Sequence, residues 1–294
     1  MNTARLRTVR DLMRFAVNRF DQAELSFGHG THNAHDEAAY LVSHALELPL
    51  DQLDRFLDTS LTGKQVKSVL KILRQRVAKK IPAPYLTHEA WLGDLRFYVD
   101  RRVIVPRSFI AELLRTRLQP WIKSAHAINS ALDLCTGSGC LAILMALVFP
   151  NAVVDASDVS RSALAVARRN ISDYGFADRI NLIRSSLFNA LHGRRYDLIV
   201  ANPPYVNART MRTLPAEYRY EPRLALDGGK DGLDYVRPIL KSAAKHLRKK
   251  GLLVVEIGHN RAILERAFPK IAFTWPETSA GNRNVFLLDR GHLS

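Results

Sequence analysis

Asp133-Leu-Cys-Thr-Gly137-Ser-Gly139-Cys140 begins at the end of a short, mostly apolar run, residues 131–134, and leads directly into a second one, residues 141–148. Glycines at 137 and 139 let the backbone turn tightly and approach a ligand without a Cβ in the way. A helix that begins after such a turn points its first N–H groups at that ligand. The segment therefore predicts a strand, a turn and a helix that together form a site for a nucleotide-like cofactor.

From residue 128 onward, short apolar runs alternate with helical patterns. This order is typical of βαβ units and predicts an α/β domain with a doubly wound, mostly parallel sheet over residues 128–294. The predicted strands are residues 131–134, 153–157, 180–183, 198–201 and 252–257.

The amino-terminal third of the chain shows apolar residues at helical spacing, which predicts a small helical domain over residues 1–95. Two examples are Ala38, Leu41, Val42, Ala45 and Leu46, and Val66, Val69, Leu70, Leu73 and Val77. Prolines, Gly93-Asp94 and an alternating apolar pattern then predict a hairpin-like connector, which extends to about residue 127. The helix after Thr62 carries Lys64, Lys67, Lys71 and Arg74. These cations form either a solvated face or a docking surface for a charged substrate.

The composition points to acidic partners. Forty-three Lys and Arg against 28 Asp and Glu give a formal charge of +15 and a pI of about 10.1, a field that attracts polyanions such as RNA. The alternative is that the basic surface only keeps the protein in solution. The longest apolar run, Cys140 to Phe149, has half of the about 20 residues that a membrane-spanning helix needs. We therefore expect no membrane segment.

Basic residues crowd the amino terminus, at Arg5, Arg7, Arg10, Arg14 and Arg19, as in an organellar transit peptide. However, the apolar residues of this segment, Leu12, Phe15, Ala16 and Phe20, share one helical face, which favours a folded helix. The only two cysteines lie inside one motif rather than in a disulfide framework, and this predicts a reducing, cytoplasmic setting.

Asp158 stands 21 residues after Gly137, at the end of the second predicted strand, where a carboxylate can bind the ribose hydroxyls of a cofactor. A nicotinamide cofactor and S-adenosylmethionine both fit this spacing. Asp133, before the glycines, suits a cofactor with a cationic amino-acid end, and a second motif downstream is one that dehydrogenases do not need. The combination favours S-adenosylmethionine. No metal is expected, since His29, His32 and His35 lie among loop residues with no cysteine nearby.

The second motif is Asn202-Pro203-Pro204-Tyr205, at the end of the fourth predicted strand. Ligands bind at the carboxyl ends of strands in open α/β sheets. Because the prolines fix φ and remove backbone donors, the Asn202 side-chain oxygen and the Pro203 carbonyl form a rigid pair of acceptors. A planar amide or adenine NH₂ group would donate to both oxygens while Tyr205 stacks on its plane. The motif predicts methylation of such a nitrogen; a simple proline-rich loop is the alternative.

The chain resembles the protein-glutamine N-methyltransferases over nearly its whole length, and most closely the branch that acts on ribosomal proteins. The matching segments are Gly28-His-Gly-Thr31, Asp36-Glu37-Ala38, Pro84-Tyr-Leu-Thr87, Val105-Pro-Arg-Ser108, Asp133 to Cys140, Asn202 to Tyr205, Glu217-Tyr-Arg-Tyr-Glu-Pro222 and Asp231-Gly-Leu233. The resemblance implies a Rossmann-like class I methyltransferase that modifies a glutamine on the third protein of the large ribosomal subunit. The sister branch, which modifies the Gly-Gly-Gln loop of release factors, usually has proline where Ser108 stands.

The resemblance also implies roles for residues at the cofactor. Asp158 would hold the ribose, the turn of Cys135, Thr136, Gly137, Ser138 and Gly139 would surround the methionine part, and the segment Ser185 to Phe188, with Ser186 and Leu187, would lie beside the adenine. The family commonly has Asp where Ser186 stands, so the adenine contact here lacks a charge. Three rival functions stay open: the release-factor enzyme, an adenine-N6 methyltransferase of DNA or RNA, and a noncatalytic ribosome assembly factor.

Overall fold

A computed structural model describes residues 6–293, so Arg5 lies outside the described part of the chain. The chain forms two compact units. The helical unit runs to Ala90 and also contains Pro215–Tyr220; the sheet unit consists of Trp91–Leu214 and the chain from Glu221 onward. The sequence places residues 215–220 in the second domain, whereas the structure groups them with the first.

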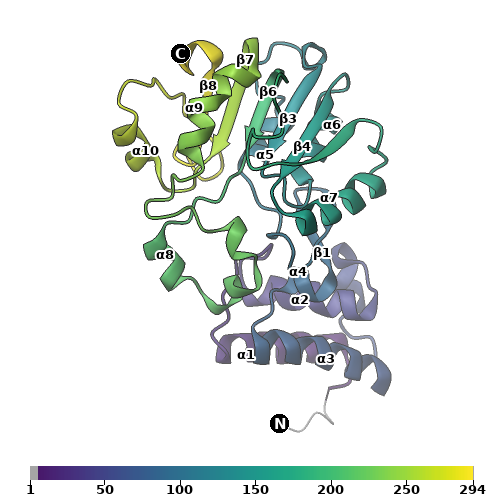
Figure 1. Ribbon diagram of the computed structural model, residues 1–294. Coiled ribbons are helices and arrows are strands. Elements are labelled where there is room, and N and C mark those ends of the chain that lie inside the picture. Colours follow the sequence, from purple (N-terminus) through teal and green to yellow (C-terminus); the bar gives the residue numbers. More distant parts are fainter. Residues whose placement is uncertain (1–5, 294) are drawn as a thin grey trace. The chain divides into compact units, whose positions relative to one another are not determined.

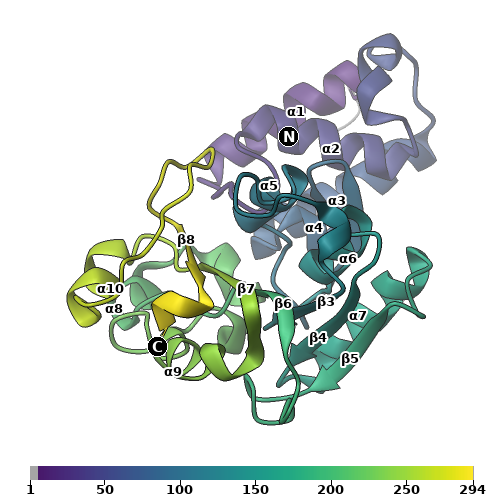
Figure 2. The same ribbon diagram turned by 90° about the horizontal axis from the view of Figure 1, so that it is seen from above.

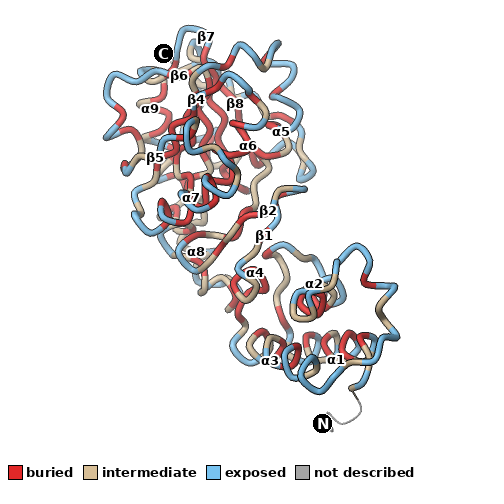
Figure 3. The backbone as a smooth tube through the Cα atoms, turned by 90° about the vertical axis from the view of Figure 1, so that its right-hand side faces the viewer, coloured by how far each residue is buried: buried red, intermediate tan, exposed pale blue. Residues whose placement is uncertain are grey.

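The helical unit is built from α1 (Val9–Gln22), α2 (Ala34–Leu46), α3 (Gly63–Lys79) and the short α4 (Ala83–Thr87). Thr8 and Thr62 are the N-cap residues of α1 and α3. Each forms a capping box, in which side chains accept hydrogen bonds from free N–H groups at the start of the helix. The three long helices bury one apolar face each in a common core. Figure 1 shows α1 and α3 side by side, and Figure 3 shows their buried inner faces. The helices predicted from apolar spacing are confirmed.

The sheet unit contains a six-stranded sheet in the order β5-β4-β3-β6-β7-β8 (Figure 2). Its strands are β3 (Ser130–Leu134), β4 (Val153–Asp158), β5 (Ile180–Arg184), β6 (Tyr196–Ala201), β7 (Leu247–Glu256) and β8 (Val285–Asp289). The first five are parallel and correspond to the five predicted strands. β8 pairs antiparallel with β7 and was not predicted. The predicted doubly wound, mostly parallel sheet is confirmed.

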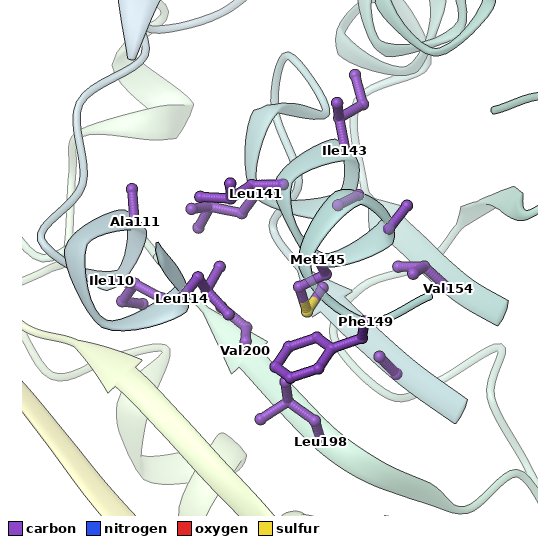
Figure 4. Close-up of a cluster of buried hydrophobic side chains, with 14 of the residues drawn as sticks. Ile110, Ala111, Leu114, Leu141, Ile143, Met145, Phe149, Val154, Leu198 and Val200 are labelled. Carbon is purple, nitrogen blue, oxygen red and sulfur yellow. The ribbon is translucent and has the colours of Figure 1, made fainter. Parts of the chain in front are cut away.

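Helices cover both faces of this sheet, because alternate strand residues point to opposite sides. Leu198 and Val200 join a core with α5 (Ile110–Arg115), α6 (Cys140–Val148) and α7 (Arg161–Asp173). Figure 4 shows Met145 and Phe149 of that core directed at Leu198 and Val200. Ile199 and Ala201 of the same strand join a second core with α9 (Val236–His246) and α10 (Arg261–Ala267).

Two short strands, β1 (Glu89–Leu92) and β2 (Leu95–Tyr98), form a separate two-stranded sheet around the turn at Gly93, as the predicted hairpin requires. One further short helix, α8 (Ala208–Thr213), follows β6. No helix within residues 6–293 is long and apolar enough to cross a membrane.

The sheet order fixes the place of the site. The chain winds outward in one direction from β3 to β5 and in the other from β6 onward, so the strand order reverses between β3 and β6. Such a reversal opens a crevice at the carboxyl ends of the strands, where ligands bind in open α/β folds. The glycine turn follows β3 and the Asn-Pro-Pro-Tyr motif follows β6. Both motifs therefore lie at this crevice.

Candidate active site

The turn after β3 uses its two glycines for different purposes. Gly137 and Gly139 both have positive φ, 55° and 82°. A Cβ on Gly139 would lie 3.2 Å from the Cβ of Ala167, so this glycine lets the start of α6 pack closely against α7. A Cβ on Gly137 would meet nothing within 4 Å, because this residue faces a cavity. Gly137 thus supplies the bend of the turn and Gly139 the helix packing.

Asp133 lies beneath the turn rather than on the cavity wall. Its Oδ2 accepts hydrogen bonds from the Thr136 hydroxyl (2.5 Å) and the Ala142 amide (3.1 Å), which tie the turn to α6. Burial raises the pKa of this carboxyl to about 7, against the lowering effect of those two donors. Its Oδ1 is buried and accepts no hydrogen bond within the described residues. One carboxylate oxygen is therefore left for a further donor.

Asp158, at the end of β4, borders the cavity beside the turn. Its Oδ2 accepts the Gly137 amide at 3.0 Å and its Oδ1 accepts the Ser160 amide at 2.9 Å. Burial raises the pKa of this carboxyl, and the backbone donors act in the opposite direction. Each oxygen retains a lone pair for a ligand hydroxyl.

The cavity brings together seven of the residues that the sequence singles out: Cys135, Gly137, Asp158, Ser186, Leu187, Asn202 and Pro204. Six others do not line it: Asp133, Thr136, Ser138, Gly139, Pro203 and Tyr205. Several lining residues were missed by the sequence analysis, among them Ile104, Val159, Leu224, Ala225 and Tyr235. Tyr235 comes just before α9 in a loop without periodicity, so no local pattern marks it.

Some of the predicted residues act on the shape of the turn. Thr136 and Ser138 are buried. The Ser138 carbonyl accepts the Asn170 side-chain amide at 2.9 Å, and the same amide group of α7 bonds the backbone of Tyr98 in both directions. Burial raises the pKa of the Cys140 thiol to about 12, so the thiol stays neutral and inert as a core filler.

The segment after β5 is held in an unusual conformation. Leu187 has a φ of 47°, and its carbonyl accepts the Ser185 hydroxyl at 2.6 Å. The Ser185 oxygen in turn accepts the Ala190 amide at 3.0 Å. This arrangement leaves Ser186 exposed at the cavity wall, where it presents a neutral hydroxyl.

At the end of β6, the Asn202 side-chain amide donates to the Arg107 carbonyl at 3.4 Å. The other atom of that side chain, Oδ1, is left as an acceptor. Arg107 is itself fixed, because its guanidinium makes two bonds to the buried Glu221 at 2.5 and 2.6 Å. Neither the Asn202 Oδ1 nor the Pro203 carbonyl accepts a protein hydrogen bond within residues 6–293. The two acceptors are therefore available to a substrate.

Tyr205 is enclosed by a network that the sequence analysis missed. Its hydroxyl donates to Glu256 Oε1 at 3.2 Å, and Glu256 Oε2 accepts the Ser108 hydroxyl at 2.6 Å and the Phe109 amide at 3.0 Å. Burial raises the pKa of Glu256 and of the Tyr205 phenol. A Cβ on Gly258 would lie 2.7 Å from the Tyr205 ring, so only glycine allows this approach. A carboxyl group at the end of a predicted strand is the signal that could have identified Glu256.

If Glu256 acts by positioning the Tyr205 hydroxyl, Glu256→Gln is expected to lower kcat for methyl transfer about tenfold, an estimate from one weakened hydrogen bond to a charged group. In the Tyr205→Phe background the same substitution is expected to have almost no further effect. Rates of the two single variants and the double variant, with cofactor affinity as a control, measure this coupling. Strictly additive losses would show that Glu256 does not act through the phenol.

The chain is similar to several known proteins. The family model "Methyltransferase small domain" matches residues 111–217. The ribosomal protein uL3 glutamine methyltransferase of Neisseria meningitidis serogroup B is 57% identical, with 98% of this chain and 95% of that protein covered. The chain belongs to the ribosomal protein uL3 glutamine methyltransferases. Another member of the family, from Bordetella pertussis, is 53% identical over 100% of this chain and 98% of its own length. The member from Francisella tularensis is 41% identical over 98% and 92%.

A solved structure, the hMettl16 catalytic domain in complex with MAT2A 3′UTR hairpin 1, has a TM-score of 0.53 and 16% sequence identity, and covers 85% of this chain and 89% of that one. At this identity the likeness concerns the fold alone. Membership in the family makes the chain a methyltransferase, and methyltransferases of this fold use S-adenosylmethionine in general. The resemblance found in the sequence is thereby confirmed.

Proposed function

We propose that this protein transfers a methyl group from S-adenosylmethionine to the side-chain amide nitrogen of a glutamine on ribosomal protein uL3. The names of relatives that are 41–58% identical over nearly the full chain support this substrate. The observation that carries the chemistry is the available acceptor of Asn202 at the edge of the Asp158 cavity. The protein would act in the cytoplasm, with uL3 as its partner either free or in an assembling particle that contains ribosomal RNA.

One feature beneath the glycine turn and one on the cavity wall fit the cofactor. The buried Oδ1 of Asp133, which has no hydrogen-bond partner within the described residues, leaves a negative charge available to a cationic group, and the open space at Gly137 admits a ligand against the backbone. Asp158 would hold the ribose, the turn at Cys135–Gly139 the methionine part, and Ser186 and Leu187 the adenine. When bound, the cofactor supplies an electrophilic methyl group on a sulfonium.

The protein's own task is to place the glutamine nitrogen. Asn202 Oδ1 and the Pro203 carbonyl would each accept one hydrogen of the NH₂ group, while the Tyr205 ring sets the height of the amide plane. Acceptors on both hydrogens favour the more pyramidal nitrogen of the transition state, whose lone pair is less delocalised. This arrangement needs no strong base before methyl transfer.

The alternatives are separable by experiment. Purified protein with labelled S-adenosylmethionine is incubated with free uL3, release factor, DNA or RNA, each in its own reaction. Label on a uL3 glutamine, located by mass spectrometry, is the expected result. Label on the release factor would support the sister activity, label on nucleic acid the adenine-N6 reaction, and label on none a noncatalytic role.

Asp158→Ala is expected to weaken cofactor binding by about 1.5 to 3 kcal/mol, the range for hydrogen bonds to a charged group. The rate should approach that of the wild type at saturating cofactor, because the carboxylate binds ribose rather than the reacting atoms. Titration calorimetry measures the affinity. Asp173→Ala, at the exposed end of α7, is the matched control and is expected to bind normally. Unchanged affinity in Asp158→Ala would place the ribose elsewhere.

We also propose that the helical unit recognises the protein substrate. None of its described residues lines the cofactor cavity, because the lining residues all belong to the sheet unit. Lys64, Lys67, Lys71 and Arg74 of α3 are exposed, which is compatible with either a solvated face or a docking surface.

A further inference from the structure

Six basic residues gather at the amino ends of β6 and β7, the edge of the sheet opposite the candidate active site. They are Arg194, Arg195, Lys245, Arg248, Lys249 and Lys250, which we call the amino-edge patch. Tyr196, next to Arg195, pairs with Leu247, which stands between Lys245 and the other three. The start of β6, the end of α9 and the start of β7 thus bring the six cations to one place.

The patch is exposed and mostly uncompensated. Arg194 pairs with Asp155 at 2.7 Å and Arg248 with Asp197 at 3.2 Å. Both carboxylates also serve the fold, since Asp197 accepts the backbone amides of Asn129 and Ser130 at the start of β3, and Asp155 accepts the Tyr196 hydroxyl. The remaining four cations, Arg195, Lys245, Lys249 and Lys250, are exposed and have no ion-pair partner within the described residues.

One neighbouring side chain responds in part to these cations. Burial lowers the pKa of His246 most, the hydrogen bond with the Arg194 carbonyl opposes that effect, and His192 and Lys245 lower the pKa further. Like charges held together cost free energy unless an anion relieves them.

The lysines also stand on a fixed piece of backbone. Tyr196 pairs with Leu247, and Leu198 with Leu252, so Asp197 alone opposes the four residues of a bulge, Arg248 to Gly251. A Cβ on Gly251 would lie 2.8 Å from the Tyr196 carbonyl oxygen, which shows how closely the bulge returns to β6. A bulge held in this way presents Lys249 and Lys250 with little backbone entropy left to lose on binding.

We propose that the amino-edge patch binds the phosphodiester backbone of RNA. The four closely spaced cations without ion-pair partners match the charge of successive phosphates, and Lys and Arg contacts to phosphates carry no base readout. An acidic protein surface would also need apolar anchors, and none of the exposed large apolar side chains of the described residues belongs to the segments that carry the patch. RNA held at this edge leaves the carboxyl edge to the protein substrate. If the proposed function holds, the enzyme can therefore methylate uL3 while attached to a ribonucleoprotein particle.

The test compares two double charge reversals. Binding of a fluorescent 20-nucleotide single-stranded RNA is measured by anisotropy between 50 and 200 mM salt. Lys249→Glu with Lys250→Glu is expected to weaken binding about tenfold or more and to reduce the slope of log K against log salt by about 1.4, or about 0.7 for each phosphate that is no longer neutralised. Lys67→Glu with Lys71→Glu on α3 makes the same charge change and is expected to stay within about twofold of the wild type.

Cofactor affinity is expected to be unchanged in both variants, since neither pair lies at the cavity, and transfer to isolated uL3 is expected to be unchanged in the Lys249→Glu, Lys250→Glu variant. Equal loss of RNA binding in the two variants would overturn the proposal, because it would reveal only an effect of net charge. A polyglutamate peptide that depends on Lys249 and Lys250 as strongly as RNA would overturn it in favour of an acidic protein. Absence of uL3 methylation by the wild type would contradict the proposed function and leave the RNA comparison intact.

Discussion

Asn202→Ala is expected to reduce the rate of methyl transfer at saturating substrates about 100-fold or more, the usual cost of one preorganised contact that strengthens in the transition state. The alanine removes Oδ1, the acceptor at the carboxyl end of β6, and also the donor to the Arg107 carbonyl. Single-turnover kinetics with a uL3 substrate measure the chemical step directly. Cofactor affinity should change little, because in the proposed site Asp158 and the glycine turn would make the main contacts.

Asn207→Ala provides the matched control for this experiment. Asn207 caps α8, where its side chain accepts the Thr210 amide at 2.9 Å, and lies only five residues from Asn202. The same chemical change here should leave single-turnover rates within about twofold, since a lost cap costs about 1 kcal/mol of local stability and nothing in the reaction. Similar rates in the two variants would remove Asn202 from the mechanism.

Arg76→Ala is expected to lower the stability of the helical unit by about 3 to 5 kcal/mol, the cost of breaking a buried ion pair. Arg76 on α3 has 1% of its surface exposed and bonds Glu37, Glu217 (3.2 Å) and the Ser26 carbonyl (2.9 Å). Its loss leaves two buried carboxylates without a cation. Hydrogen exchange of the α2 and α3 amides reports the free energy of opening of this unit alone.

Arg74→Ala, two residues away on the exposed face of α3, is the control and is expected to change that free energy by less than about 0.5 kcal/mol. A loss below about 1 kcal/mol in Arg76→Ala would mean that water or rearranged side chains compensate the two carboxylates.

The sequence predicts the parts of the fold that local patterns encode. The five parallel strands contain short apolar runs that alternate with helical patterns, so the sequence pattern identifies them even where, as in β5, only one residue is buried. The sequence pattern did not predict β8, because this strand follows a short α10 and the turn-rich segment 274–284, which gives no βαβ pattern. Its position is set by antiparallel pairing with β7, a long-range choice that local spacing does not contain.

The candidate site also has a part that local patterns encode and a part that they do not. The glycine turn and the Asn-Pro-Pro-Tyr motif are contiguous, and Asp158 lies at a strand end, so the sequence locates them. The residues that hold these motifs in place come from distant segments: Ser108 bonds Glu256 at 2.6 Å across 148 positions, and Arg107 bonds Glu221 across 114. No local pattern could have paired these residues. Their contacts arise only once the sheet brings the strand ends together.

Glu217 has a consequence for how the protein is made. It belongs to the helical unit, where it bonds Arg76, yet the two residues are 141 positions apart. During translation α1 to α3 leave the ribosome long before Glu217 does. Until Glu217 is synthesised, Arg76 can pair with only one of its two carboxylate partners, Glu37. The helical unit is therefore synthesised first but completes its ion pairs only after most of the chain has been made. A fragment that ends at Ala90 would lack the Arg76–Glu217 ion pair, so expression of the helical unit by itself would require residues 215–220 to be fused to it.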